Sequence, residues 1–477
     1  MLQTLKNAWR TKDIRSKLLF TLLILLLYRI GTVIPVPFVD AHDVNTQITG
    51  TGTILDLMNI MSGGALGEAT LFALGVSPYI NASIIIQLLA VVFPKLGELS
   101  KTDKKKMGLI TRVTTVILAI VTAIGYYFLI ANNQLRVALA PIATHGQNDL
   151  YWMYGIVIVV CYVAGASLVM WLADRINEHG IGNGVSMILF ANIVTSLPQQ
   201  LGAMYTLIEG TFTYNENKVG FIILSIAFAL LMVAITLALT VFVIFITGSE
   251  RRIPVQYAKR VVGRKMYGGQ SSNLPIKLNM TGVMPVIFAS SIVSLVPTIL
   301  TLCRVTESTE GFWGWFYRFT GPNGVLYPIL FFVLIIAFAY FYTQITFDPV
   351  DVANNLKKQG GAIPGIRQGR PTSDYIKKIL NKITLAGALF LSVVAVLPVI
   401  AGPHIIQHIV EWILSGNPQI QQLTGEALTT QLTAAAKSYS SAFTFGGTSL
   451  IIVVGVALET YRELEAQLTM RNYKGFL

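Results

Sequence analysis

The sequence predicts an all-α polytopic membrane protein, and three observations lead to that fold class. Of the 477 residues, 53% are hydrophobic and only 12% are charged, about half the charged fraction of a typical soluble domain. The apolar residues gather in long runs, and the basic residues fall mainly in alternate segments between those runs. This composition excludes an ordinary soluble domain and a disordered chain. The two cysteines are too few for a disulfide scaffold or a cysteine-rich metal module.

Each apolar run is long enough for a membrane-spanning helix, which needs about 20 residues. Runs such as residues 18–27 lack the two-residue alternation that is typical of a barrel strand. Because lipid offers backbone groups no hydrogen-bond partner, the spans should be helical. Ten spans are expected, at residues 18–36, 71–93, 108–131, 151–173, 185–208, 219–247, 281–303, 325–347, 379–401 and 446–466.

The distribution of Lys and Arg predicts the orientation of these spans. If the N-terminus is cytoplasmic, 29 of the 35 basic residues lie in segments on the cytoplasmic side. Five lie on the other side, and Arg29 falls within the first span. Since basic residues prefer the cytoplasmic side, we expect both termini to be cytoplasmic. The net charge of +12 is therefore concentrated on one face.

Two long cytoplasmic loops, at about 248–280 and 348–382, carry seven basic residues each. One interpretation is that these charges only fix the topology and contact anionic lipid headgroups. A second interpretation starts from the length of the loops and from their glycines, which interleave with basic and apolar residues. Such a surface suits the docking of a large polyanion or an acidic partner, for which ribosomal RNA and a cytosolic motor protein are both candidates.

The segment at 54–68 lies between the first two spans and is too short and too polar to cross the bilayer. It is either an interfacial or re-entrant segment that packs against its neighbours, or a mobile stopper made pliable by Gly63, Gly64 and Gly67. Re-entrant backbone is tolerated at membrane depth only where it is buried in protein or lines a cavity. Either interpretation predicts that the bundle has an interior.

Six blocks of sequence, in order along nearly the whole chain, resemble the SecY family. That family is the central channel subunit of the bacterial Sec protein translocase. A single block of this kind has little specificity, but six in register are highly specific. The blocks are MSGGAL (61–66) with PYINASIIIQLL (78–89), EHGIGNGVS (178–186), YAKR (257–260), LPIKLN (274–279), PGIR (364–367) and FGGTSL (445–450).

The resemblance implies a channel of two pseudo-symmetric, inverted five-helix halves, 1–210 and 211–477, around a central pore. Unfolded secretory proteins would cross the bacterial cytoplasmic membrane through the pore, and transmembrane segments would leave sideways into lipid through a lateral gate. A bound motor ATPase or ribosome would drive the process. The implied partners are the membrane subunits SecE and SecG, the motor SecA, the ribosome with its RNA, secretory and membrane protein substrates, and anionic lipids.

The resemblance also implies roles for particular residues. Branched aliphatic side chains in a pore ring would dewet when closed and bar ions, and they could reshape around any passing side chain. Gln87 is a polar residue expected at the lateral gate. The plug is expected at about 54–69. The pore ring maps to Val76, Ile80, Ile181, Val185, Ile287 and Ile452, the plug to Asn59, Met61, Ser62, Gly63, Gly64, Ala65 and Leu66, and the docking positions to Arg264, Lys265, Lys357, Lys358 and Arg367.

Two other functional classes remain as alternatives, a small-solute transporter and an intramembrane enzyme. A transporter with broken helices should place polar ligands near the bilayer midplane, where we find only Gln87 and Asn192, the expected partners of helix–helix hydrogen bonds. The sequence contains no phosphate-binding loop of the form GxxxxGK[ST]. We therefore expect no enzyme activity, no catalytic residue and no cofactor.

A long outer insert, at about 402–443, departs from the familiar pattern of the family. Its first residues suggest an amphipathic surface helix that contains Trp412. His404 and His408 lie one helical turn apart, a spacing that can bind zinc. They lack the further residues of a zinc motif, so we favour a solvated interfacial helix and expect no metal site.

Overall fold

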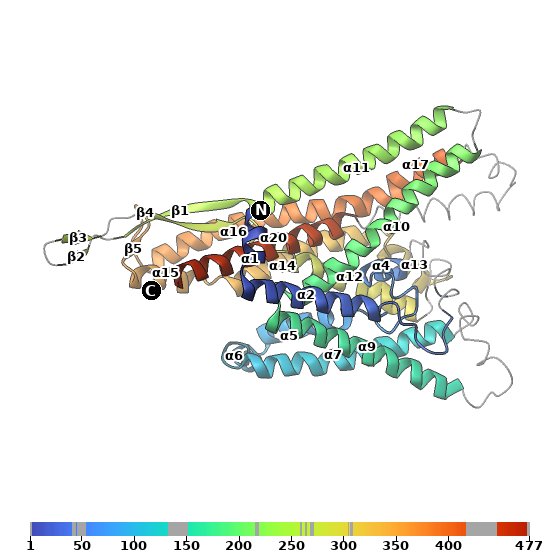
Figure 1. The fold of residues 1–477 in the computed structure, drawn as a ribbon, viewed down its shortest axis with the longest axis horizontal. Helices are drawn as coiled ribbons and strands as arrows, with labels where there is room; N and C mark the ends of the chain where they lie inside the picture. Colours follow the sequence, from blue (N-terminus) through green and yellow to red (C-terminus); the bar gives the residue numbers. More distant parts are fainter. Residues whose placement is uncertain are drawn as a thin grey trace.

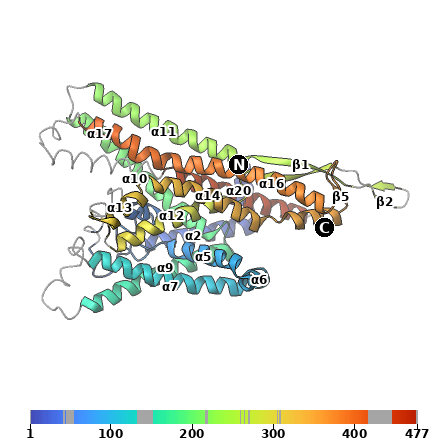
Figure 2. The ribbon, with the colours of Figure 1, turned by 180° about the vertical axis from the view of Figure 1, so that it is seen from behind.

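The computed structural model is an elongated helical bundle whose long helices run side by side (Figure 1). Both chain ends lie toward the end of the bundle that carries the β-strands, and the view from behind shows the same arrangement (Figure 2). The described residues are 2–40, 44, 54–131, 151–214, 219–257, 260–262, 265–267, 271–303, 305, 309–415 and 446–474.

A long helix lies at each of the ten predicted spans, so the all-α polytopic fold class is confirmed. By length and composition, six of the described helices could cross a membrane, and two apolar helical stretches, Ser77–Val92 and Gly184–Pro198, are shorter. The ten helices are α2 (Lys12–Gly31), α5 (Ser77–Val92), α7 (Lys104–Ala131), α9 (Tyr151–His179), α10 (Gly184–Tyr214), α11 (Val219–Gly248), α12 (Met284–Leu302), α14 (Leu326–Thr346), α16 (Arg370–Ala401) and α20 (Gly446–Lys474).

Shorter helices connect or flank the long ones. The first of them, α1, packs against α2 and α20. In the outer insert, η3 and α17 are described, whereas 416–443 lie outside the described residues. The short helices are α1 (Leu2–Arg10), α4 (Ile54–Met61), α6 (Pro94–Thr102), α13 (Phe312–Thr320), α15 (Pro349–Lys358), the π-helix η3 (Gly402–Ile406) and α17 (Gln407–Ser415).

A small sheet, which the all-α prediction missed, joins the two basic loops. Strand β1 (Glu250–Tyr257) pairs antiparallel with β4 (Ser271–Lys277) on one side and with β5 (Gly361–Ala362) on the other. Strand β1 alternates, with Ile253 and Val255 buried between exposed neighbours, as expected for a strand with one covered face. A two-stranded hairpin, β2 (Arg260–Val262) with β3 (Lys265–Tyr267), lies between β1 and β4 in the chain.

The sheet packs on the first turns of α16 through a separate apolar cluster. Ile253 and Ile276 of the sheet, Leu356 of α15, and Ile376 and Leu380 of α16 are all buried in it. The loops that the sequence presents as two basic segments therefore form one body fixed to one helix.

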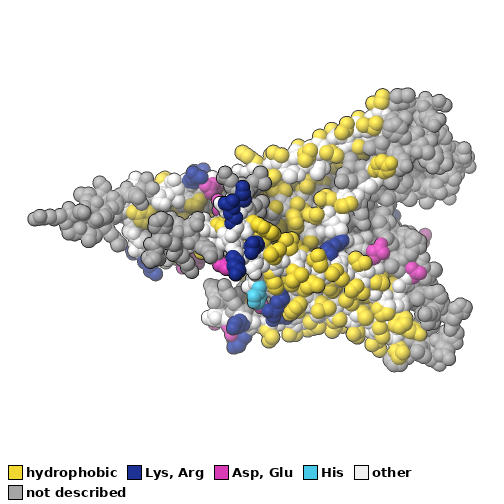
Figure 3. Space-filling model, in the orientation of Figure 1, with side chains coloured by type: hydrophobic (Ala, Val, Ile, Leu, Met, Phe, Trp, Pro, Cys, Tyr) yellow, Lys and Arg dark blue, Asp and Glu magenta, His cyan; other side chains and the backbone are white. Residues whose placement is uncertain are grey.

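Apolar side chains cover the outer surface of the long helices, and Lys and Arg gather toward the end with the strands (Figure 3). On α11, Leu230, Val241 and Phe245 are at least 65% exposed. Large apolar side chains exposed along a whole helix are typical of a surface that faces lipid. The distribution in space therefore agrees with a multi-pass membrane protein.

Candidate functional site

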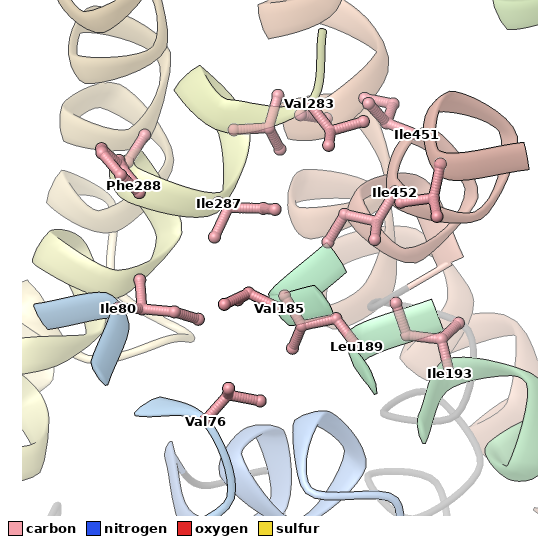
Figure 4. Close-up of a cluster of buried hydrophobic side chains, with 14 of the residues drawn as sticks. Val76, Ile80, Val185, Leu189, Ile193, Val283, Ile287, Phe288, Ile451 and Ile452 are labelled. Atoms are coloured by element: carbon pink, nitrogen blue, oxygen red, sulfur yellow. The ribbon is translucent and has the colours of Figure 1, made fainter. Parts of the chain in front are cut away.

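Five of the six predicted pore-ring residues lie in one buried apolar cluster in the middle of the bundle. They come from four helices: Val76 and Ile80 lie at the start of α5, Val185 on α10, Ile287 on α12 and Ile452 on α20. Each is at most 9% exposed. In Figure 4, Ile80, Val185 and Ile287 point toward one another across the space between their helices.

The sixth residue, Ile181, does not join this cluster. It precedes α10 and packs in a separate cluster with Ala8 of α1, Ile14 of α2 and Leu464 of α20. Its backbone N–H donates to Thr21 Oγ1 at 3.1 Å. The position of Ile181 therefore does not support a place in the pore ring.

Two residues that the sequence analysis did not name lie in the same cluster as Val185. Leu189 and Ile193 follow Val185 at intervals of four residues on α10, so all three lie on one face of the helix. Both are at most 4% exposed and belong to the same cluster (Figure 4). The helical period counted from Val185 could have found them. We call the set Val76, Ile80, Val185, Leu189, Ile193, Ile287 and Ile452 the apolar collar.

A small cavity lies between the collar and the predicted plug. Its volume is about 40 Å³, which is room for a few water molecules and far too little for a polypeptide. The lining is mostly apolar and includes collar residues, Met61 of α4 and Val399 of α16. The lining residues are Met61, Leu189, Ile193, Ser290, Tyr327, Phe331, Val399, Thr448, Ser449 and Ile452.

The predicted plug consists of α4 and a compact turn that continues to Thr70. The side-chain Oδ1 of Asn59 accepts from the N–H of Gly67 at 2.7 Å, and its carbonyl accepts from the N–H of Gly64 at 2.9 Å. Ser62 Oγ donates to the Asn59 carbonyl at 2.9 Å and accepts from the N–H of Leu66 at 3.1 Å. These local bonds make the turn one folded unit, so it can move as a body rather than as a loose strand.

Three long helices hold this unit inside the bundle. Tyr126 of α7 donates to the Leu66 carbonyl at 2.8 Å. Thr298 of α12 lies 3.7 Å from the Met58 sulfur, and Asn192 of α10 donates to the Met61 carbonyl at 3.0 Å. Ala65 and Leu66 are 1% exposed, so the unit is buried in protein, as the sequence analysis expects for non-spanning backbone at membrane depth.

The polar residue Gln87 joins α5 to α14. Its Oε1 accepts a short hydrogen bond from the hydroxyl of Tyr342, and its Nε2 donates to Ser83 Oγ at 3.0 Å. The Tyr342 ring also meets Phe288 of α12 edge-on, with ring centroids 5.1 Å apart. The sequence analysis expected a helix–helix hydrogen bond at Gln87, and Tyr342 is the partner.

The predicted docking residues lie at the end of the bundle with the strands. Lys357 and Lys358 are exposed in the last turn of α15, and Arg367 is exposed in the following turn. That turn is fixed by Thr372 Oγ1, which donates to the Arg367 carbonyl at 2.8 Å. Lys265 begins β3, and only its backbone is described. Arg264 lies outside the described residues.

Cations also meet at the base of the sheet. Lys277 of β4 and Arg462 of α20 line a cavity of about 190 Å³. Burial lowers the pKa of Lys277, and the nearby Arg462 lowers it further. Glu250 and Glu459 raise that pKa in turn, and Glu459 lines the same cavity, so charges of both signs meet at the base of the sheet.

We find no cluster of three or more metal-ligating side chains within the described ranges. In the outer insert, His408 Nδ1 lies 3.3 Å from a carboxylate oxygen of Glu411, and Trp412 is 58% exposed. An exposed tryptophan beside charged groups is typical of a helix at the membrane surface.

Comparison with known proteins places these features in a family. A sequence model of the SecY family matches residues 70–461. The chain is 40% identical over 486 residues to the protein translocase subunit SecY of Streptomyces galbus, and 39% identical over 483 residues to that of Bacillus subtilis. Each match covers 100% of both chains.

Solved structures share the fold at low sequence identity. A structure described as a protein conducting channel matches with a TM-score of 0.60, covers 95% of this chain and 92% of its own, and is 16% identical. A SecY structure whose plug domain is described as stabilising the closed channel matches with a TM-score of 0.59, with the same coverage and identity. The Sec61 channel from a canine ribosome complex has a TM-score of 0.57 at 15% identity, again with coverage of 95% and 92%.

Proposed function

The chain belongs to the SecY family, and we propose that it is the protein-conducting channel of a translocase. It translocates unfolded secretory proteins and releases transmembrane segments laterally into the membrane. The observation that carries this function is the apolar collar closed by a buried plug. A seal of branched aliphatic side chains has no directional bonds to break, so it can close against ions and still admit any side chain.

We propose that the molecule consists of two halves that each supply two helices to the collar. Helices α5 and α10 are the second and fifth spans of the first half, and α12 and α20 are the second and fifth of the other. The second and fifth helices of each half thus supply the collar, as a repeat predicts. Because α10 continues to Tyr214, we propose that the boundary between the two halves lies after residue 214 rather than at residue 210.

The contact between Gln87 and Tyr342 supports a lateral gate between the halves. Helix α5 belongs to the first half, α14 to the second, and α5 also packs against α12. Opening the bundle toward lipid along this line requires the hydrogen bond between the two side chains to break. Gln87 is thus proposed as a polar latch on the gate.

The basic body of sheet, α15 and following turn is proposed as the docking surface for the energy source. The surface presents the exposed side chains of Lys357, Lys358 and Arg367, and strands β2 and β3 extend from it (Figure 1). Arg264 and Lys265, which belong to this loop in the sequence, are proposed as part of the same docking surface. The proposed partners are the motor ATPase SecA and ribosomal RNA, with SecE and SecG as membrane subunits. In this proposal the chain itself has no catalytic centre, and anionic headgroups contact the flanking basic residues.

We propose the bacterial cytoplasmic membrane as the location, with both termini in the cytoplasm. The ends of the chain lie toward the same end of the bundle as the basic body (Figure 1). The excess of Lys and Arg on that side favours a cytoplasmic placement.

Polar substitution in the collar should open it to ions. Leu189→Ser or Ile193→Ser places a hydroxyl in the constriction, which favours water there, so we expect the resting conductance in planar bilayers to rise several-fold. Ile181→Ser is the matched control, because Ile181 packs outside the collar. A rise in conductance with Ile181→Ser and none with Leu189→Ser would restore the original assignment.

Deletion of residues 59–67 should raise the resting ion conductance, because the collar loses the body that covers it. The same planar-bilayer recording measures this effect. A deletion that leaves the conductance unchanged would count against the plug.

Charge reversal on the basic body should weaken docking. Arg264→Glu, Lys265→Glu or Arg367→Glu should reduce motor or ribosome binding in a sedimentation assay, and the loss should shrink as ionic strength rises. Arg318→Glu on α13, at the other end of the bundle, changes the net charge equally and serves as the control. Intact binding combined with an inverted topology would favour the interpretation that these charges only orient the protein.

Gln87→Leu should make the gate easier to open, because the hydroxyl of Tyr342 loses its acceptor. We expect a coupling energy of about 0.6–1.7 kcal/mol between Gln87→Leu and Tyr342→Phe in a double-mutant cycle on channel opening. Tyr340→Phe is the control, since the Tyr340 hydroxyl bonds to the Asn381 carbonyl of the neighbouring helix α16 at 3.1 Å. Unchanged translocation and ion leak in Gln87→Leu would refute the latch.

A further inference from the structure

A single buried amide joins the plug to two helices of the first half. Asn192 of α10 is 0% exposed. Its Nδ2 donates to the Met61 carbonyl at 3.0 Å and to the Tyr28 hydroxyl of α2 at 2.9 Å. A side-chain amide nitrogen carries two hydrogens, so both are used. Removing Asn192 therefore removes a direct bond between α10 and the plug.

The plug meets Asn192 through a glycine that has no room for a side chain. Gly63 has a φ of +70°, which a side chain makes unfavourable. A Cβ there would lie 2.9 Å from Asn192 Oδ1 and 3.1 Å from Arg29 Nη1. The plug thus seats against the amide of Asn192 and the guanidinium of Arg29 together.

Arg29 contacts the seated plug without a hydrogen bond to it, in contrast to Asn192. Its Nη1 is buried and makes no hydrogen bond within the described part of the chain, and the same holds for Asn192 Oδ1. A buried charged group without its full set of hydrogen bonds costs free energy. Arg29 lies in the last turn of α2, where the helix dipole favours a cation, so the helix tolerates the charge. Arg29 as a whole is partly exposed, so departure of the plug would let water reach Nη1, the one guanidinium nitrogen that the seated plug keeps dry.

We propose that Asn192 and Arg29 act on the plug in opposite directions, and that their balance sets how often the resting channel is unsealed. This inference rests on the proposed role of residues 54–69 as the plug. Asn192 is a positioning residue that holds the plug through Met61, and Arg29 favours its release through its own hydration. The Asn192 hydrogen bond favours the seated plug, and the hydration of Arg29 favours the released plug. Both act at Gly63, so a modest free-energy contribution from a bound partner would shift the equilibrium between the seated and the released plug.

The test measures how often the plug leaves its seat. A single cysteine is introduced by Met58→Cys, where the native sulfur lies 3.7 Å from Thr298 Oγ1 of α12. The two free cysteines are first removed by Cys161→Ser and Cys303→Ser. The full channel is placed in vesicles, and the labelling rate by a membrane-impermeant maleimide on the outer side reports the unseated fraction.

We expect Asn192→Leu to speed labelling about three- to tenfold, which is the range for one buried hydrogen bond in a membrane protein. Gly63→Ala should act in the same direction. Arg29→Met, which keeps the length of the side chain and removes its charge, should slow labelling about threefold or more. The double variant Asn192→Leu with Arg29→Met should return toward the parent rate.

Ser196→Ala is the matched control. Ser196 is also buried on α10, one turn beyond Asn192, but its hydroxyl donates to the Ile193 carbonyl of its own helix at 2.8 Å. Its labelling rate should equal that of the parent. Local loosening of the fold would speed labelling, whereas Arg29→Met is expected to slow it, so that variant keeps the test informative even if Asn192→Leu folds poorly.

Two results would overturn the inference. Equal labelling in Asn192→Leu, Arg29→Met and parent would remove both roles, and faster labelling in both single variants would remove the opposition between them. Either result would leave the plug itself standing as long as the 59–67 deletion raises the conductance. A silent deletion would instead remove the plug, and with it the basis of this inference.

Discussion

The contact of branched aliphatic side chains across the collar is the interaction on which the rest of the structure depends. It joins helices from both ends of the chain without a hydrogen bond, so closing it orders no donor or acceptor, and opening it leaves none unpaired. Dispersion and the exclusion of water hold such a contact together. Dispersion and the exclusion of water are each weak per atom pair, and neither depends on the chemical identity of the side chain that contacts the collar. A seal made in this way is reversible, which a network of buried polar groups would not be.

The polar groups near the collar lie around it rather than in it. Asn192 contacts the plug and α2, while Gln87 and Tyr342 link α5 to α14. Hydrogen bonds between membrane helices contribute only about 0.6 kcal/mol on average. A few hydrogen bonds of this size would bias the positions of the proposed plug and gate without locking either one.

Hydropathy alone was enough to predict the ten spans, because each helix must satisfy its own backbone in lipid. Ile181 packs outside the collar for a local reason: the motif at 180–185 straddles the start of α10 at Gly184, so helical spacing does not apply before it. The sheet was missed because β1 lies among charges and contains Pro254, a residue that argues against a central strand. The partners of Asn192 lie 131 and 164 residues away in the chain, and no local pattern encodes such a pairing.

Helix α16 connects the basic body to the collar region. Near its start, Ile376, Leu380 and Ile383 pack under the sheet and α15. Farther along, Leu391, Val394 and Val399 belong to the central cluster, and Val399 lines the cavity beneath the plug. A helix of 32 residues is about 48 Å long and resists compression along its axis. Because one rigid element is packed at both places, a partner that tilts the basic body also displaces the wall of the cavity. In the proposed function, force applied to the basic body would thus reach the wall of the cavity.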